Sequence, residues 1–238
     1  MLAKSCATPH RSDMAIETTY QIPAAPAPYR GVGSELIRWI CKAYLSLTGW
    51  RVTSGFPDVA KAVLIAAPHT SNWDGINMLA AAGYYRVKLR WMGKASLVKG
   101  PFGGIVRRMG CVPVDRANAA DLVEQTTAAF KAADDLILAI APEGTRSKVA
   151  TWKTGYHRIA LAAGVPLMVS VLDYGSKTIR IADVFGPSTD YDADFNRIVA
   201  HYEDAVGKRG EKFSVGAARG DAQATPSSAS AGSAAQSD

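Results

Sequence analysis

The sequence predicts an α/β fold with a largely parallel central sheet, one antiparallel strand pair, helices on both faces and an amphipathic N-terminal helix in front. Three observations lead to this prediction. Short apolar runs alternate with segments that have the periodicity of helices. Such alternation is typical of parallel sheets, because each crossover places a helix on a face of the sheet. Near the C-terminal end, two apolar runs are separated only by a short turn, which favours an antiparallel pair.

The first predicted element is an amphipathic helix from Leu36 to Trp50. Its apolar side chains fall near one helical face, and Arg38 and Lys42 lie elsewhere on the wheel. A helix of this kind packs on its domain or lies in a membrane interface, where tryptophans sit at headgroup depth. The residues alone slightly favour packing on the domain.

The first half of the domain then begins with a strand. The run 62–67 is apolar throughout, as in a buried strand, and 74–85 has helical periodicity. A second strand is expected at 87–92 and a short one at 111–114. In parallel sheets, chemistry gathers in the loops beyond the carboxyl ends of the strands.

The second half continues the alternation. A helix is expected at 119–133, with Asn118 as its N-cap, because asparagine side chains accept from the first free backbone amides of a helix. A strand follows at 136–141, then a helix at 155–163. Gly164 ends that helix, since glycine readily adopts the left-handed conformation after the last turn.

The antiparallel pair is expected at 166–174 and 177–185, joined by a turn at Gly175 and Ser176. A last helix covers 192–206. Four segments result, which we expect to be a flexible tail, a helical segment, one α/β domain and a flexible Ala- and Ser-rich tail. They span residues 1–33, 34–51, 52–213 and 214–238.

Composition excludes several classes of protein. Of 238 residues, 48% are hydrophobic and 20% charged, which excludes a wholly disordered chain. No apolar stretch approaches the roughly 20 residues that a membrane-spanning helix needs. Three scattered cysteines predict neither a disulfide framework nor a zinc site and suggest a reducing compartment. No strand is followed by a Walker loop, a G-x-S-x-G elbow or a dinucleotide fingerprint.

The excess of positive charge is concentrated in one segment. The chain has 27 Lys and Arg against 21 Asp and Glu, a net charge of +6. Residues 86–116 include eight basic residues and one acidic residue, so this segment carries +7 and the rest of the chain −1. Such a segment attracts the phosphates of nucleic acid, of a lipid surface or of a small metabolite, or it consists simply of solvated faces.

A histidine and an aspartate follow the first strand of the domain. His69 comes just after the strand, and Asp74 lies five positions on, at the start of a helix. A carboxylate beside one imidazole nitrogen stabilises the cation that forms when the other nitrogen takes a proton. No serine or cysteine nucleophile is nearby, so His69 is a candidate general base for a substrate hydroxyl. By themselves these two residues also fit a loop histidine and a helix cap.

Two further clusters could bind an anion. The strand at 136–141 is followed by Glu143-Gly-Thr-Arg-Ser147, in which hydroxyls, backbone amides and the planar fork of Arg146 suit a phosphate. The basic segment continues from Lys94 through loops rich in glycine and proline to Arg116, which follows a short strand.

These clusters, in this order and together with Val165-Pro166 before a later strand, resemble the glycerophosphate acyltransferase superfamily. That superfamily contains the 1-acylglycerol-3-phosphate acyltransferases. His69 to Asp74 resembles its H-x4-D motif, Lys94 to Arg116 its second block and Glu143 to Ser147 its E-G-T-R-S motif. The resemblance covers about residues 63–171 and favours the catalytic interpretation of the histidine–aspartate pair. Many members have Asn before the histidine, where this chain has Pro68.

The resemblance implies a function and its residues. His69, held by Asp74, would deprotonate an acceptor hydroxyl that attacks the thioester of acyl-CoA or acyl carrier protein, with no metal or cofactor. The acceptor's phosphate would be held by Gly144, Thr145 and Arg146, assisted by Arg116 and Lys94, and Glu143 would organise that site. The expected acceptor is a lysophospholipid, most simply 1-acylglycerol-3-phosphate, and the product phosphatidate.

The resemblance also implies partners and location. The helix at 34–51 becomes an interfacial anchor, and the protein is expected at the cytoplasmic face of a membrane with anionic lipids, as a peripheral protein that binds no nucleic acid. There are two alternatives. The protein is an acyltransferase for another lysolipid or hydroxylated lipid, or it is a non-catalytic protein that binds anionic lipid. His157 is expected on a helix surface, and His10 and His201 have no acidic or thiol partner at ligand spacing.

Overall fold

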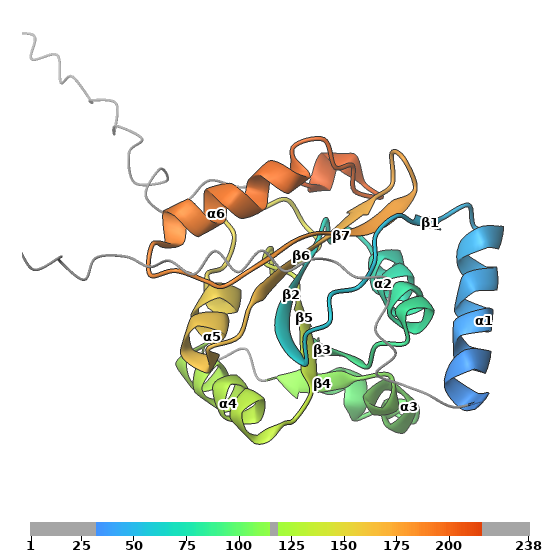
Figure 1. Cartoon of the computed structure of the whole chain (residues 1–238), viewed down its shortest axis with the longest axis horizontal. Helices are drawn as coiled ribbons and strands as arrows, with labels where there is room; N and C mark the ends of the chain where they lie inside the picture. Colours follow the sequence, from blue (N-terminus) through green and yellow to red (C-terminus); the bar gives the residue numbers. More distant parts are fainter. Residues whose placement is uncertain (1–31, 115–118, 216–238) are drawn as a thin grey trace, which may run out of the picture.

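The computed structural model describes residues 32–114 and 119–215 (Figure 1). In this part of the chain, seven strands form one sheet in the order β1-β7-β6-β2-β5-β3-β4. The strands are β1 (Arg51–Val52), β2 (Lys61–Ala67), β3 (Leu89–Lys94), β4 (Cys111–Val114), β5 (Leu136–Ile140), β6 (Leu167–Asp173) and β7 (Thr178–Phe185). Neighbouring strands are parallel except β6 and β7, which are antiparallel. The predicted sheet is confirmed.

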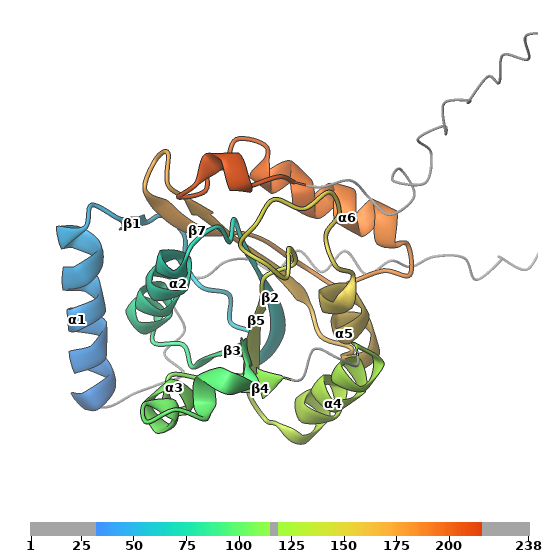
Figure 2. The ribbon, with the colours of Figure 1, turned by 180° about the vertical axis from the view of Figure 1, so that it is seen from behind.

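Helices cover both faces of the sheet. They are α1 (Val32–Leu47), α2 (Asn72–Tyr85), α3 (Gly103–Arg108), α4 (Ala119–Ala132), α5 (Gly155–Ala163) and α6 (Tyr191–Val199), with short 3₁₀ helices η1 (Ala95–Val98), η2 (Ala200–Tyr202) and η3 (Gly210–Lys212). Helices α4, α5 and α6 lie on one side and α2 on the other, with α1 outside α2 (Figures 1 and 2). The core therefore has two apolar layers, one on each face.

Strand β2 contributes to both layers. Val63 and Ile65 belong to the layer under α5 and α6, whereas Ala62 and Leu64 belong to the layer under α2. Side chains alternate along a strand, so a strand covered on both faces is apolar at nearly every position. This burial explains why the sequence of β2 has no polar alternation.

The register of the central strands places three loops at one edge of the sheet. Ile65 of β2 pairs with Ile140 of β5, and Ala67 pairs with Val171 of β6, all in parallel. The carboxyl ends of β2, β5 and β6 therefore lie side by side. The segments after these strands meet at this edge, which is where parallel sheets place their sites.

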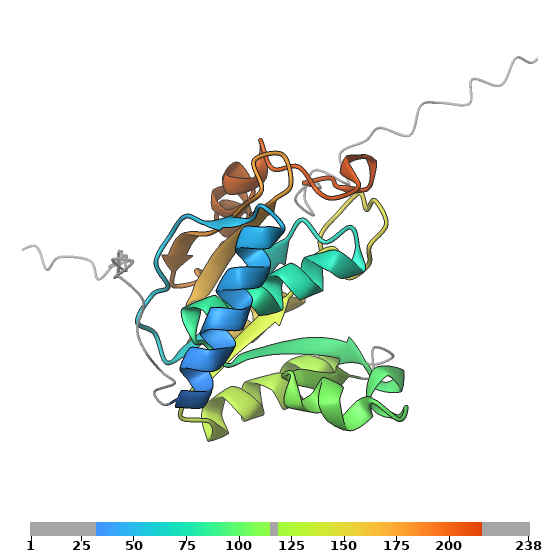
Figure 3. The same ribbon diagram turned by 90° about the vertical axis from the view of Figure 1, so that its right-hand side faces the viewer.

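Helix α1 differs from its prediction. It begins at Val32 and ends at Leu47, so Trp50 lies beyond it, where it is buried. The helix crosses α2 at close range (Figure 3), because a Cβ on Gly83 would lie 2.4 Å from Cys41 Sγ. Leu45 is also buried. One edge of α1 thus packs on the domain, as the residues alone had favoured.

The rest of the apolar face of α1 is exposed. Leu36, Ile37, Trp39, Ile40 and Leu47 form this α1 stripe, with exposed fractions that reach 70% at Trp39 and 87% at Leu47. No helix among the described residues is both long enough and apolar enough to cross a membrane.

Several boundaries also differ. Strand β1 was not predicted, because two residues carry no periodicity, and β3 begins two residues later than expected. The last α-helix ends at Val199 and continues only as the 3₁₀ turn η2. Gly164 ends α5 with φ 65°, as predicted. Asn118 and most of both tails lie outside the described residues.

Candidate active site

The loop after β2 brings His69 and Asp74 together. His69 follows the strand, and Asp74 is the third residue of α2, so both project at the carboxyl edge of the sheet. His69 Nδ1 lies 3.8 Å from Asp74 Oδ2, and the side chains are 32% and 3% exposed. A buried carboxylate thus lies beside an imidazole that solvent can reach, which is the arrangement that the H-x4-D spacing predicts.

Asp74 is held by the loop that carries His69. Its Oδ2 accepts from the backbone N–H groups of Thr70 and Ser71, each at 2.6 Å, and its Oδ1 accepts from the Ser71 hydroxyl at 2.7 Å. A carboxylate in the first helical turn is also favoured by the helix dipole. Asp74 therefore both caps the helix and faces the imidazole. Its interpretation as a helix cap is compatible with its interpretation as the partner of His69.

Glu143 reaches the same loop from the end of β5. Its Oε1 accepts from the His69 backbone N–H at 2.9 Å, and the residue is buried. Burial raises the pKa of Glu143 to about 7, although the His69 N–H bond lowers it. Its Oε2 has no hydrogen-bond partner among the described residues. In this structure the contact of Glu143 is to the backbone of the histidine.

The remaining residues of the E-G-T-R-S motif lie at the surface. The Arg146 guanidinium donates to Asn72 Oδ1 at the start of α2, which joins this loop to the histidine loop. Thr145 and Arg146 are exposed. Gly144 has φ 65°, a left-handed conformation that favours glycine, whereas the Lys153 side chain that a Cβ would meet is flexible.

Of the two basic residues predicted to assist phosphate binding, the structure describes one. Lys94 is the exposed last residue of β3, whose neighbour in the sheet is β5, so it lies at the same edge as the motif loops. Arg116 lies outside the described residues.

Sequence reasoning missed Tyr174. Its hydroxyl donates to Asp74 Oδ1 at 2.7 Å, and Asn77 Nδ2 donates to that hydroxyl at 3.1 Å. Tyr174 follows β6 directly, so the only sequence signal was its position at the end of a strand that neighbours β2. The segment after η2 was missed as well: Arg209 N–H donates to Thr70 Oγ1 at 3.2 Å, and the Lys208 ammonium lies 4.6 Å from the Trp73 ring centroid.

The prediction for His157 was wrong, and the one for His201 concerned the spacing along the sequence alone. His157 is buried rather than on a helix surface, and its Nε2 lies 2.8 Å from Asp194 Oδ2. His201 does have an acidic partner, because its Nε2 lies 3.4 Å from Asp183 Oδ2. Both partners come from elements that the linear spacing does not connect. Among the residues that the structure describes, no three or more potential ligands gather as a metal site would require.

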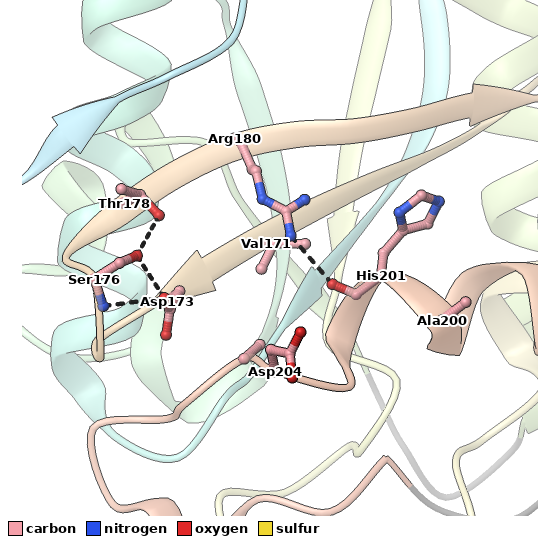
Figure 4. A pocket seen from close by; sticks show the side chains of 9 residues that line it. Val171, Asp173, Ser176, Thr178, Arg180, Ala200, His201 and Asp204 are labelled. Atoms are coloured by element: carbon pink, nitrogen blue, oxygen red, sulfur yellow. Dashed lines mark hydrogen bonds between the residues drawn. The ribbon is translucent and has the colours of Figure 1, made fainter.

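Two hollows lie near the carboxyl edge. A cavity of about 290 Å³ lies beside the β6–β7 turn (Figure 4), and Arg180, His201 and Asp204 line it. None of the predicted site residues does. An apolar groove of about 310 Å³ lies between the end of α1, the start of α2 and Tyr174, with Lys177 and Lys208 in its lining. Through Tyr174 this groove adjoins Asp74.

Comparisons with known proteins identify a family for this chain. A structural comparison found the 1-acyl-sn-glycerophosphate (LPA) acyltransferase PlsC from Thermotoga maritima, at 18% identity and a TM-score of 0.47, covering 68% of this chain and 72% of that one. No match was found among curated proteins. The family model named Acyltransferase matches residues 51–172, which is more than half of the chain and includes His69, Asp74 and the E-G-T-R-S loop. The chain therefore belongs to the acyltransferase family.

Proposed function

We propose that this protein transfers a fatty acyl group from acyl-CoA or acyl carrier protein to the hydroxyl of a lysophospholipid. The simplest acceptor is 1-acylglycerol-3-phosphate, which would give phosphatidate. The observation that carries the proposal is the solvent-accessible His69 imidazole beside the buried Asp74, within the part of the chain that matches the family.

In the proposed reaction His69 is the general base. With Nδ1 turned to Asp74, Nε2 takes the proton of the acceptor hydroxyl while its oxygen attacks the thioester carbonyl. The tetrahedral intermediate collapses, the C–S bond breaks, and the leaving sulfur takes the proton back from the imidazolium. The 3.8 Å separation shortens to a hydrogen bond when substrate binds, as is common for catalytic pairs. This route forms no acyl-enzyme and uses no metal or cofactor.

The acceptor's phosphate would bind at the E-G-T-R-S loop. Arg146 offers a planar donor fork, and its contact with Asn72 places it close to the start of α2 and so to Asp74. Thr145 adds a hydroxyl, and Lys94 adds positive charge at the same edge. We propose that Arg116 completes this site, as the resemblance implies.

The apolar groove would hold the lipid part of a substrate. Trp50, Trp73 and Tyr174 supply aromatic surface, and Lys177 and Lys208 supply positive charge. A lysophospholipid has the same combination of an apolar chain and an anionic headgroup.

Attachment to a membrane surface is proposed from two exposed apolar regions. One is the α1 stripe. The other, on η1 and α3, combines exposed Leu97, Phe102, Ile105 and Met109 with exposed Lys99, Arg107 and Arg108. Apolar side chains interleaved with basic ones favour an anionic lipid surface. We therefore propose a peripheral protein at the cytoplasmic face of a membrane.

Mass spectrometry of the lipid products tests the catalytic proposal. The purified protein is incubated with mixed lysolipids and hydroxylated lipids plus acyl-CoA or acyl carrier protein thioesters, beside a His69→Ala variant. We expect diacyl product from lysophosphatidate in the wild type alone. Product from another acceptor alone would show that lysophosphatidate is not the acceptor. No product from any acceptor would refute the proposed acyltransferase activity.

Co-sedimentation with phosphatidylglycerol-containing vesicles tests the membrane proposal. A Trp39→Ser and Ile40→Ser double variant removes exposed apolar side chains of α1, and Leu161→Ser, at an exposed position of α5, is the control. We expect weaker binding of the α1 variant only. Equal binding of all three proteins would place the membrane contact elsewhere.

A further inference from the structure

A chain of hydrogen bonds joins helix α1 to the carboxylate of Asp74. Tyr44 OH donates to Asn77 Oδ1 at 3.0 Å, and Asn77 Nδ2 donates to Tyr174 OH at 3.1 Å. Tyr174 OH in turn donates to Asp74 Oδ1 at 2.7 Å. The chain links α1, α2 and the end of β6, and three of its residues, Tyr44, Asn77 and Tyr174, line the apolar groove.

The chemistry of the groups fixes the direction of this chain. The Tyr174 hydroxyl has one proton, and its shortest contact is to a carboxylate oxygen, which only accepts. Tyr174 can therefore only accept from its remaining neighbours, which include Ser71 and Asn77, and in the amide of Asn77 only the nitrogen donates. The amide oxygen then faces Tyr44, which donates to it. One orientation of Asn77 satisfies all three bonds.

Tyr174 keeps its hydroxyl proton, and so remains a donor, at neutral pH. Burial raises the pKa of its hydroxyl, and the bond to the Asp74 carboxylate raises it further. Asn77 is buried as well, so water does not compete for its amide. Donor chains of this kind polarise one another in the direction of the final acceptor.

We propose that Tyr174 is a positioning residue for the His69–Asp74 pair, and that Asn77 and Tyr44 orient its hydroxyl, which couples helix α1 to the catalytic histidine. Only the role of His69 as a base rests on the proposed function. Tyr174 adds a second donor to Oδ1, beside the Ser71 hydroxyl, and so helps to keep Oδ2 turned to His69 Nδ1. The bond also draws negative charge toward Oδ1 and away from the imidazole.

Removal of this donor has a defined consequence. Without the Tyr174 hydroxyl, Asp74 keeps more negative charge on the oxygen that faces His69, and the imidazolium is stabilised. The midpoint of the His69 titration should then move to higher pH. The other charged groups around the pair are Glu143, which binds the His69 backbone, and Arg146, which binds Asn72. Lys208 lies over Trp73. None of these groups changes in the variants.

NMR titration of the histidine side chains in the full-length protein tests the proposal without any need for turnover. The His69 signal is assigned from its loss in His69→Ala. We expect an upward shift of its midpoint in Tyr174→Phe and a smaller upward shift in Tyr44→Phe. The matched control is Tyr85→Phe, because the buried Tyr85 hydroxyl bonds Ser54 and not Asp74. It should leave the midpoint unchanged.

An unchanged midpoint in a folded Tyr174→Phe would overturn the proposal. If that variant fails to fold, Tyr44→Phe decides, because the Tyr44 hydroxyl lies at the outer end of the hydrogen-bond chain. An unchanged His69 midpoint in Tyr44→Phe would contradict the coupling to α1. In the acyl-transfer assay, kcat of Tyr174→Phe should fall about tenfold with KM unchanged, and the acid limb of the pH profile should move up. A shifted midpoint without any acyl transfer by the wild type refutes only the proposed function.

Discussion

Two of the three histidine–aspartate pairs in the described part of the chain differ in nearly every physical respect. His157 and Asp194 lie 2.8 Å apart and are both buried between α5 and α6. His69 and Asp74 lie 3.8 Å apart, and the imidazole is partly open to solvent. The tighter contact is the one without access for a substrate. Under the proposed function, the pair with the longer contact and the access for a substrate is the catalytic one.

The environments of the two aspartates add to this contrast. Asp194 Oδ2 accepts both from His157 and from the Ser188 backbone N–H at 2.6 Å, so it fastens α5 to the segment before α6. Asp74 accepts from its own loop and from Tyr174, and its histidine is held through the backbone by Glu143. The buried pair links helices, whereas the open pair is surrounded by groups that orient a side chain.

The largest expected effect is on turnover and comes from His69→Ala. Loss of a general base should lower kcat by a factor of about 10² to 10⁴. The thermal midpoint should stay near that of the wild type, because the side chain is partly exposed. Steady-state kinetics and thermal unfolding measure the two quantities. Retained turnover would mean that the open pair is not the catalytic one.

The reciprocal change is His157→Ala, and its effect should be on stability. The variant removes the histidine partner of the buried Asp194 carboxylate, which costs about 3 to 5 kcal/mol of unfolding free energy. Activity per folded molecule should be unchanged. Denaturant titration at neutral pH checks the first part, and kinetics at low temperature the second. A loss of turnover in folded His157→Ala would mean that the buried pair is also needed for activity.

The buried Glu143, which binds the backbone of the open pair, makes the stability of the folded protein depend on pH. Its pKa is about 7 when folded and lies near 4.5 in an ordinary setting, so the folded state binds the extra proton between these values. Stability from this group is fully present below pH 4.5 and is lost as the pH rises through 7, by up to about 3 kcal/mol. The uncharged Glu143→Gln should show a flatter profile between pH 5 and 8 in denaturant titrations. Parallel profiles would contradict the raised pKa.

A smaller effect is expected from Arg146→Ala. Loss of a charge-assisted contact to phosphate should lower kcat/KM for a phosphate-containing acceptor by about 10- to 100-fold. The matched control is Arg197→Ala, which removes an exposed arginine of α6 that pairs with Asp183 of β7. If both variants behave alike, the E-G-T-R-S loop does not bind the phosphate.

Much of the fold was predictable because its signals are local. The apolar run of β2, the glycine that ends α5 and the turn between β6 and β7 follow from backbone and side-chain preferences within a few residues. The His69–Asp74 contact was predictable for the same reason, since five positions separate the two residues. Strand β1 was not predictable, because its two residues exist as a strand only through their pairing with β7.

The sequence by itself determined the α/β class, the acyltransferase motifs and the order in which they occur. Tertiary structure alone decided that Tyr174, a hundred positions from Asp74, completes the shell of that carboxylate, and that His157 is buried against Asp194. It also decided that α1 packs by one edge and leaves its apolar stripe exposed. Periodicity and spacing carry information over one or two turns of chain, whereas these contacts depend on which strands become neighbours in the sheet.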